Sequence, residues 1–125
     1  MDIRVKRILD RPEITDGFRV YVERKWPLGL PVDEAEVDVW LKDLAPSEGL
    51  HSWFSDKPER WAEFERGYFA ELDGKFEHVR KVLDEAMEGT VTLLHDSGDS
   101  DYNPAVAVRD YIEAKKDLLV GKSAA

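Results

Sequence analysis

Residues 90–95 read Thr-Val-Thr-Leu-Leu-His, a run in which apolar and β-branched side chains predominate. This composition is typical of a strand that is buried on both faces of a parallel sheet. An acidic loop follows over residues 96–102, and Asn103-Pro104 then places a helix-capping side chain before a proline at the first helical position. A strand, a loop and a capped helix in this order predict an α/β domain whose helices pack on a small sheet.

Two further strands, residues 3–9 and residues 18–23, are predicted upstream. In the second of them a phenylalanine and two valines alternate with other residues and therefore share one face. Residues 10–17 are turn-forming and too short for a helical crossover, so we expect the first two strands to be antiparallel if they are neighbours. The strands at 18–23 and 90–95 are expected to be parallel and adjacent, because the long connection between them suits a helical crossover.

That connection is predicted to be helical over most of its length. A capping box at residues 33–36 precedes apolar positions with helical spacing over 37–44, and Ser47 can cap a short helix after it. A longer apolar stripe runs over residues 58–88. One helix of that length would be about 46 Å long, whereas a globule of this size has a radius of gyration of about 14 Å. We therefore predict two helices, separated at Asp73-Gly74.

The length of 125 residues fits one compact domain that buries about two-thirds of its surface. Trp40, Trp53 and Trp61 are expected to be largely buried, because each lies on the apolar face of a separate predicted helix. We predict one α/β domain over residues 1–120, with a three- to four-stranded, mostly parallel sheet flanked by about five helices. The first strand is either antiparallel or parallel, and residues 121–125 form a disordered tail.

The charge of the chain is acidic and unevenly distributed. Its 18 Lys and Arg and 27 Asp and Glu give a formal net charge of −9, with +2 over residues 1–30 and −11 over the rest. An acidic body repels phosphate backbones, so we expect no nucleic-acid partner. The chain has no cysteine, which excludes disulfides and thiolate metal sites and suits a reducing cytoplasm. No apolar run is long enough to span a membrane, so we expect a soluble, cytoplasmic protein without a membrane partner, as a monomer or homodimer.

Several aromatic and proline-containing segments resemble one known family in order and spacing. These segments are Glu23–Gly29, Trp40–Ser47, Trp53-Phe54, Pro58–Trp61, Phe64, Tyr68, Glu71-Leu72 and Val91–Leu94, followed by Asn103 and Ala105. The chain is identified by them as similar to the YeaO-like family of small bacterial proteins, domain of unknown function 488. The resemblance covers nearly the whole chain, and it implies an α/β fold and no agreed activity.

The chain departs from the family pattern at four polar positions. The family loop usually reads Asp-Arg-Leu-Trp-Pro-Arg-Gly, and this chain has Glu23, Lys25 and Leu28 at the changed positions. The family tends to have arginine at the position of His51, histidine at that of Asp56 and histidine at that of Tyr102. The resemblance therefore implies that any family site built from these positions is weakened or re-specified in this chain.

A first candidate ligand site lies just after the second predicted strand. Glu23, Arg24 and Trp26 follow this strand at the edge where open α/β sheets bind ligands. Arg24 can bind a carboxylate or a phosphate through two donors, and the indole of Trp26 can stack on a planar ligand. In the alternative interpretation, which is the commoner case for such residues, Trp26 fills the core and Arg24 pairs with a nearby acid.

A second candidate site joins His95, at the end of the last predicted strand, to the helix N-terminus at Asn103. The free amides and the dipole of a helix N-terminus favour an anion. Asp96, Asp99 and Asp101 place three negative charges in the same loop and offset that attraction. The alternative is a solvated acidic loop in which Asn103 is only a helix cap. We expect Arg24 and His95 to reach the same edge of the sheet.

No metal site and no cofactor are expected. Residues 99–103 are similar to the start of a calcium loop, but Pro104 stands where that loop requires glycine. His51, His78 and His95 are not spaced as metal ligands, and the sequence has no glycine-rich cofactor motif.

Two functions from different classes remain open, and whether the protein is an enzyme is undecided. In the first, the protein binds or converts a small anionic or planar metabolite at the carboxyl ends of its strands. Arg24 would then hold the anion, Trp26 would form a stacking wall, Glu23 or His95 would act as acid or base, and Asn103 would orient the ligand. In the second, the protein is a non-catalytic interaction or regulatory module that uses an acidic helical surface.

The charge distribution leads to a first testable prediction. We expect no appreciable binding of duplex DNA or RNA at physiological salt, because the −11 over residues 31–125 outweighs the +2 of the N-terminal segment. Fluorescence anisotropy with labelled duplexes at several salt concentrations measures this directly. A sub-micromolar dissociation constant with a steep salt dependence would contradict the prediction.

Overall fold

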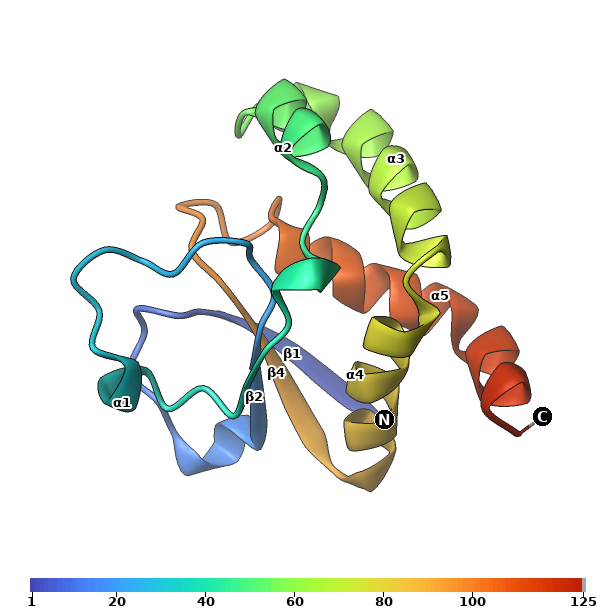
Figure 1. The fold of residues 1–125 in the computed structure, drawn as a ribbon, viewed down its shortest axis with the longest axis horizontal. Coiled ribbons are helices and arrows are strands. Elements are labelled where there is room, and N and C mark those ends of the chain that lie inside the picture. Colours follow the sequence, from blue (N-terminus) through green and yellow to red (C-terminus); the bar gives the residue numbers. More distant parts are fainter. Residues whose placement is uncertain (125) are drawn as a thin grey trace.

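The computed structural model describes residues 1–124, with side chains as far as Val120. Within this part the chain forms four strands, β1 (Asp2–Arg7), β2 (Phe18–Tyr21), β3 (Val39–Trp40) and β4 (Thr90–His95). It also forms five α-helices, α1 (Val32–Ala35), α2 (Glu48–Phe54), α3 (Trp61–Asp73), α4 (Phe76–Glu88) and α5 (Pro104–Ala124) (Figure 1). Short 3₁₀ turns, η1 (Ile14–Asp16), η2 (Lys42–Leu44) and η3 (Pro58–Arg60), lie between them.

The strands of this part form one parallel sheet in the order β1-β4-β2-β3. Ile3 of β1 stands opposite Val91 of β4, and Val20 of β2 stands opposite Leu93. The last strand is thus inserted between the first two, and the predicted parallel pairing of β2 with β4 is confirmed. The predicted small α/β domain with a mostly parallel sheet is confirmed as well.

The antiparallel alternative for the first strand is wrong. β1 and β2 are not neighbours, and both run parallel to the strand between them. Residues 8–17 can make this connection without a crossover helix, because ten residues of extended chain span up to about 33 Å. That length is enough to return beside a short strand and to cross one strand position.

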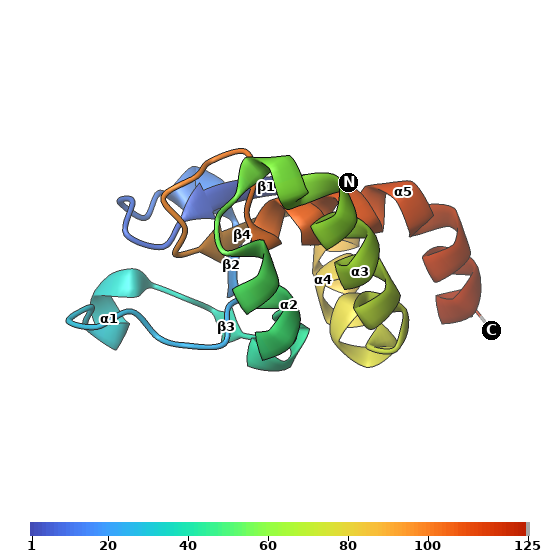
Figure 2. The same cartoon turned by 90° about the horizontal axis from the view of Figure 1, so that it is seen from above.

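Both faces of β4 are covered, but by different kinds of structure. Val91 and Leu93 face the large hydrophobic core, to which α3, α4 and α5 contribute. Leu94 faces a smaller cluster with Ile8 and Tyr21. The views in Figures 1 and 2 show these helices on one side of the sheet and the chain around α1 on the other. The apolar run at 90–95 therefore belongs to a doubly covered strand, as its composition predicts.

The predicted helix over residues 37–44 is wrong. α1 ends after four residues because Glu36 adopts a left-handed conformation with φ of 49°. The following segment pairs with the free edge of β2, with Trp40 opposite Tyr21. Two hydrogen bonds join Asp38 to the backbone of Arg19 in β2. The Asp38 carboxylate accepts from the Arg19 amide, and the Asp38 amide donates to the Arg19 carbonyl. Pairing with a strand remote in sequence overrides a helical spacing of apolar residues here.

The expected burial of the tryptophans holds only in part. Trp53 is 39% exposed on α2, where the Arg60 guanidinium lies over its ring, while Phe54 occupies the buried position. Trp61 is half-buried and its ring contacts those of Phe54 and Phe64. A helix of two turns at the rim of the core buries only one side of its apolar face, which explains the exposed indole.

Three helix boundaries predicted from single residues are confirmed, whereas the capping box predicted at residues 33–36 is wrong, because α1 begins at Val32 and has no side-chain cap. α3 and α4 are separate helices that meet at Gly74. The Ser47 hydroxyl accepts a hydrogen bond from the Leu50 amide at 3.3 Å and caps α2. The Asn103 side chain accepts one from the Val106 amide at 3.1 Å and caps α5.

The tail expected over residues 121–125 lies at the limit of the described chain. The backbone of residues 121–124 continues α5, and Ala125 lies outside the described residues. Among the helices of residues 1–124, none is long and apolar enough to cross a membrane.

Gly17 lies against the backbone of the last strand and provides a stability prediction. Its φ is 66°, and a Cβ atom placed on it would lie 2.2 Å from the Thr90 carbonyl oxygen. Gly17→Ala is expected to lower the free energy of unfolding by about 2–4 kcal/mol, through strain and through displacement of β4. Urea denaturation measures the change. Gly98→Ala is the control, because a Cβ atom there meets nothing within 4 Å, and equal stability of the two variants would contradict the packing described.

Candidate functional site

A cavity of about 470 Å³ opens at the carboxyl ends of β2 and β4. The segment after β2 contributes Glu23 and Arg24 to its wall, and the segment after β4 contributes Asp96. The opposite wall comes from the crossover, with Pro46 before α2 and Phe54 at the end of α2. This is the edge of an open α/β sheet at which ligands usually bind.

Glu23 is the titratable group that the fold holds most firmly at this cavity. Its carboxylate accepts a hydrogen bond from the Asp96 amide, which joins the ends of β2 and β4. Its carbonyl accepts a second hydrogen bond from the indole N–H of Trp40, at 2.6 Å. Burial raises the pKa of the Glu23 carboxyl above its usual range, although the Asp96 amide and the nearby His51 act in the opposite direction. The site thus holds a half-buried carboxyl group in a fixed position.

The turn that carries Glu23 is held by aromatic side chains on the opposite face of the sheet. The Tyr21 hydroxyl donates a hydrogen bond to the Lys25 carbonyl at 2.7 Å, and burial raises the pKa of this phenol. The rings of Tyr21, Trp26 and Trp40 lie 5.4–6.0 Å apart and pack against one another. These contacts fix residues 22–26 without a regular strand or helix.

The crossover segment Leu44–Ser47 forms part of the cavity wall and has its backbone bound by side chains. The Tyr68 hydroxyl donates to the Leu44 carbonyl, the Lys75 ammonium donates to the Ala45 carbonyl at 2.9 Å, and the Arg24 guanidinium donates to the Pro46 carbonyl at 3.2 Å. Glu71 accepts hydrogen bonds from the amide and the hydroxyl of Ser47. Groups from the segment after β2, from α3 and from the residue before α4 therefore set the position of this wall.

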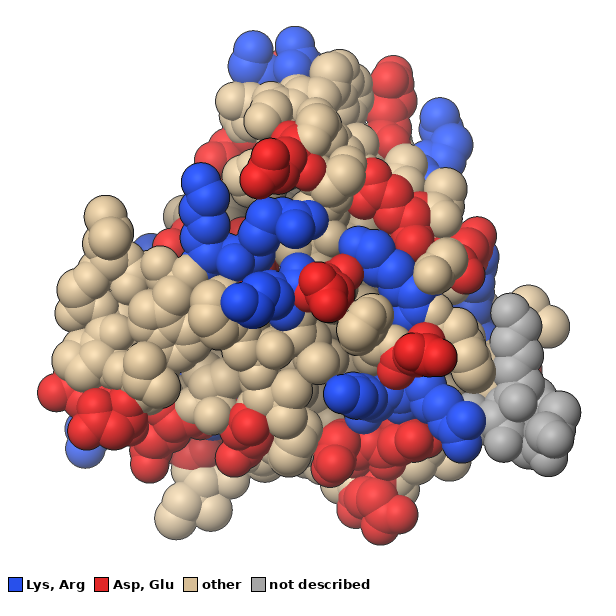
Figure 3. All heavy atoms as spheres, viewed as in Figure 1, with Lys and Arg blue, Asp and Glu red and all other residues tan. Residues whose placement is uncertain are grey.

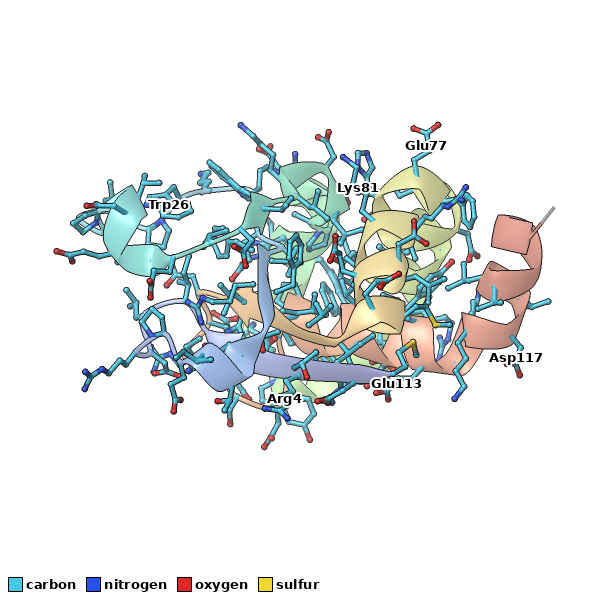
Figure 4. All side chains as sticks on the ribbon, turned by 90° about the horizontal axis from the view of Figure 1, so that it is seen from below. Arg4, Trp26, Glu77, Lys81, Glu113 and Asp117 are labelled. Atoms are coloured by element: carbon cyan, nitrogen blue, oxygen red, sulfur yellow. The ribbon has the colours of Figure 1, made fainter. Side chains whose placement is uncertain are left out.

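The predicted site residues fall into two groups. Glu23 and Arg24 line the cavity. Trp26 does not line it: its ring packs in the smaller cluster, its N–H donates to the Leu30 carbonyl at 2.8 Å, and Figure 4 shows it near α1. The packing of Trp26 agrees with the core interpretation rather than with a stacking wall.

His95 and Asn103 are also separate from the cavity wall. The His95 side chain is buried, and its Nδ1 accepts a hydrogen bond from the Ser97 amide at 3.1 Å. Asn103 is fully buried, and its amide group donates to the Asp99 carbonyl while its oxygen caps α5. The ends of β2 and β4 do meet at one edge, but His95 contributes packing there and Asp96 contributes the contact to Glu23.

Sequence reasoning missed the residues that the crossover supplies, among them Pro46, Phe54 and Phe64. One signal pointed to this wall, because His51 and Asp56, two of the four departures from the family pattern, both line the cavity. Leu28 is fully exposed and the Tyr102 ring stacks with Trp61, so the other two departures lie elsewhere.

The chemistry of the cavity combines both signs of charge with apolar walls. Acidic groups are Glu23, Glu48, Asp56 and Asp96, and basic groups are Arg24, Lys25 and His51. Within the described residues, no group of three or more His, Cys, Asp or Glu side chains is arranged to hold a metal ion. The arrangement is suited to binding a small molecule that carries a negative group and hydrogen-bond donors.

Comparison with known proteins shows which family the chain belongs to. Residues 2–121 match the family model described as "Inactive DUF488-N3 subclade". The chain is 31% identical over 114 residues to "Uncharacterized protein YeaO" of Escherichia coli (strain K12), which covers 91% of this chain and 99% of that protein. It is 37% identical over 92 residues to "Uncharacterized protein Rv3073c" of Mycobacterium tuberculosis (strain ATCC 25618 / H37Rv), over 72% of this chain and 78% of that one.

The chain therefore belongs to the YeaO-like DUF488 family, as its tryptophan and proline pattern predicts. No solved structure matches it at a significant level.

The buried imidazole of His95 leads to a pH prediction. Burial, with a smaller effect of the Arg7 charge, lowers the pKa of His95 from 6.5 to about 4. Because the folded state binds this proton less well than the unfolded state, the stabilisation is complete above pH 6.5 and is lost as the pH falls towards 4. We expect a contribution on the order of 2–3 kcal/mol to the loss of stability over this range.

Urea denaturation at several pH values tests this prediction, with His95→Asn as the variant, because the asparagine oxygen can replace Nδ1 as acceptor for the Ser97 amide. The variant should lose less stability than the wild type between pH 7 and pH 4. The exposed His51, changed to Asn, serves as control for the substitution. A His95 imidazole that titrates near pH 6.5 by NMR would contradict the burial described.

Proposed function

We propose that this protein binds, without converting it, a small planar ligand with one anionic group in the cavity at the ends of β2 and β4. The observation that carries the proposal is the placement of Glu23 and Arg24 side by side on one wall, facing a pocket with apolar side chains. A fixed acceptor, a cationic donor and apolar surfaces are the elements from which specific small-molecule sites are made.

Each of these elements has a matching group on the ligand. Arg24 uses one guanidinium nitrogen for the Pro46 carbonyl and retains others for a carboxylate or a similar anion. The Glu23 carboxylate already accepts from the Asp96 amide and retains acceptor capacity for an N–H of the ligand. Phe54 lines the cavity and provides apolar surface against part of a ring.

The charges of the wall limit the negative charge of the ligand. Glu48, Asp56 and Asp96 line the same cavity as Arg24 and Lys25. A ligand with several negative groups would meet unfavourable interactions with these carboxylates, whereas a single anion can be placed against Arg24. This balance supports a monoanionic ligand rather than a polyanion.

Binding without conversion is supported by the description of the matching family model, which names an inactive subclade. It is supported as well by the surroundings of His95 and Asn103, which the sequence analysis proposed as an acid–base group and as a residue that orients the ligand. His95 is buried outside the cavity, and burial lowers its pKa. The Asn103 side chain donates to the Asp99 carbonyl and accepts from the Val106 amide as the cap of α5. Such a binding protein would work in the cytoplasm, which suits a chain without cysteine.

Three probes of related shape test the proposal by ligand-observed NMR. Orotate is planar, carries one negative charge and has N–H donors, uracil lacks the charge, and cyclohexanecarboxylate lacks the planarity. We expect saturable binding of orotate and weaker binding of the other two. Arg24→Gln should weaken orotate binding by about tenfold or more, the value of one charge-assisted hydrogen bond.

Glu23→Gln gives a second readout that separates binding from folding. It should weaken orotate binding yet leave the stability at pH 7 equal or higher, since burial disfavours the ionised carboxyl and glutamine retains an acceptor for the Asp96 amide. Arg66→Gln and Glu59→Gln, at exposed positions, are the controls. Failure of orotate to bind, or equal affinity in Arg24→Gln and wild type, would sink the proposal.

A further inference from the structure

A second cavity, of about 550 Å³, lies on the other side of Arg24. It is lined by Arg24, by Lys75 and His78 at the start of α4, and by Asp43 of η2. Figure 3 shows Lys and Arg side chains gathered near the middle of the face that is seen in Figure 1. Such a group of cationic side chains is unexpected on a chain with a net charge of −9.

Arg24 and Lys75 lack a carboxylate partner. Their nitrogens donate to the consecutive carbonyls of Pro46 and Ala45, and among the described residues neither side chain forms an ion pair within 4.0 Å. Burial lowers the pKa of Lys75; the charge of Arg24 acts in the same direction, and those of Glu71 and Asp43 oppose it. Two cations are thus held near each other with only carbonyl oxygens as acceptors.

We propose that this second cavity is a binding site for the phosphate group of a small molecule, held by Lys75 and Arg24. The charges agree, since a phosphate monoester carries about −1.5 to −2 at pH 7 and the two side chains carry two positive charges. The guanidinium and the ammonium also present donors from different directions, which suits a tetrahedral group with three acceptor oxygens.

The neighbouring groups are consistent with this assignment. Asp43 also lines this cavity, and its carboxylate lies 3.9 Å from the His78 imidazole. Glu77 also lines the cavity from α4, and in Figure 4 its side chain points outward from the helix. Lys75 is the N-cap residue of α4 and makes no side-chain cap hydrogen bond, and the dipole of the first turn adds to the attraction of the two cations.

The site is distinct from the one proposed above. Lys75 and His78 line only the second cavity, whereas Glu23 lines only the first, and Arg24 lies between the two. The assignment to phosphate therefore does not require that orotate binds, and a variant at Glu23 separates the two proposals.

Titration with inorganic phosphate, followed by amide NMR at constant ionic strength with chloride as the reference, tests the proposal. We expect saturable shifts at Lys75, Phe76 and His78. Lys75→Gln should weaken phosphate binding about five- to tenfold, because glutamine can still donate to the Ala45 carbonyl but carries no charge. Lys75→Arg, which keeps the charge, should retain most of the affinity, and Lys81→Gln, at an exposed position on α4, should equal the wild type.

A chemical readout distinguishes a binding role from a structural one. Phosphate should protect Lys75 from reductive methylation in the wild type, as measured by mass spectrometry, while Lys81 stays reactive. Shifts that do not saturate or that chloride reproduces would mean an adventitious ion only, and an unchanged affinity in Lys75→Gln would likewise overturn the proposal. Glycerol phosphate should bind at least as well as inorganic phosphate, and exclusion of the ester would overturn the assignment to a small-molecule phosphate group. Glu23→Gln should leave phosphate binding in place, because Glu23 lines the first cavity and not the second, so failure of one proposal leaves the other open to its own test.

Discussion

Insertion of β4 between β1 and β2 is the constraint on which the rest of the structure depends. Its two neighbours, β1 and β2, come from the first 21 residues. Their facing edges pair only with β4, which follows the long crossover. Gly17 allows the close approach of the chain to Thr90, and the Asp16 carbonyl accepts a hydrogen bond from the Thr92 hydroxyl at 2.7 Å. The two sides of the sheet are therefore held by contacts that span most of the sequence.

The same insertion creates the candidate site. When β4 lies beside β2, the Asp96 amide reaches the Glu23 carboxylate, and the crossover must pass over the ends of both strands. The crossover backbone at Leu44–Ser47 finds its partners in side chains rather than in a strand or helix, with Arg24 and Lys75 among them. The backbone carbonyls of this buried irregular segment thus obtain hydrogen-bond donors, and the two cationic side chains that provide them lie beside the two cavities. A structural requirement and a capacity to bind anions thus share the same side chains.

Membership of the YeaO-like DUF488 family gives these cavities their context. His51 and Asp56, where the chain departs from the family pattern, lie on the wall of the first cavity and not at scattered surface positions. The matching family model is described as an inactive subclade. Of the site residues predicted from the sequence, Glu23 and Arg24 are the two that line this cavity.

The sequence by itself determined those features that depend on neighbours along the chain. The apolar run of β4, the break at Gly74, and the caps provided by Ser47 and Asn103 are local signals, and each is present in the structure. The long connection also determined that β2 and β4 are parallel, because a hairpin cannot contain it. The carboxyl ends of these strands could be named as a candidate site for the same reason.

Only the tertiary structure decided the features that depend on partners remote in sequence. Val39-Trp40 became an edge strand because β2 offered unpaired backbone groups, although the apolar spacing favoured a helix. Trp26 packs with Tyr21 and Trp40 in the smaller cluster, and the His95 side chain is buried. Neither of the two lines the cavity, whereas Glu23 and Arg24 do. The cavity walls from α2 and the proximity of Arg24 to Lys75 arise from packing across some fifty residues, and periodicity within a segment carries no record of such distances.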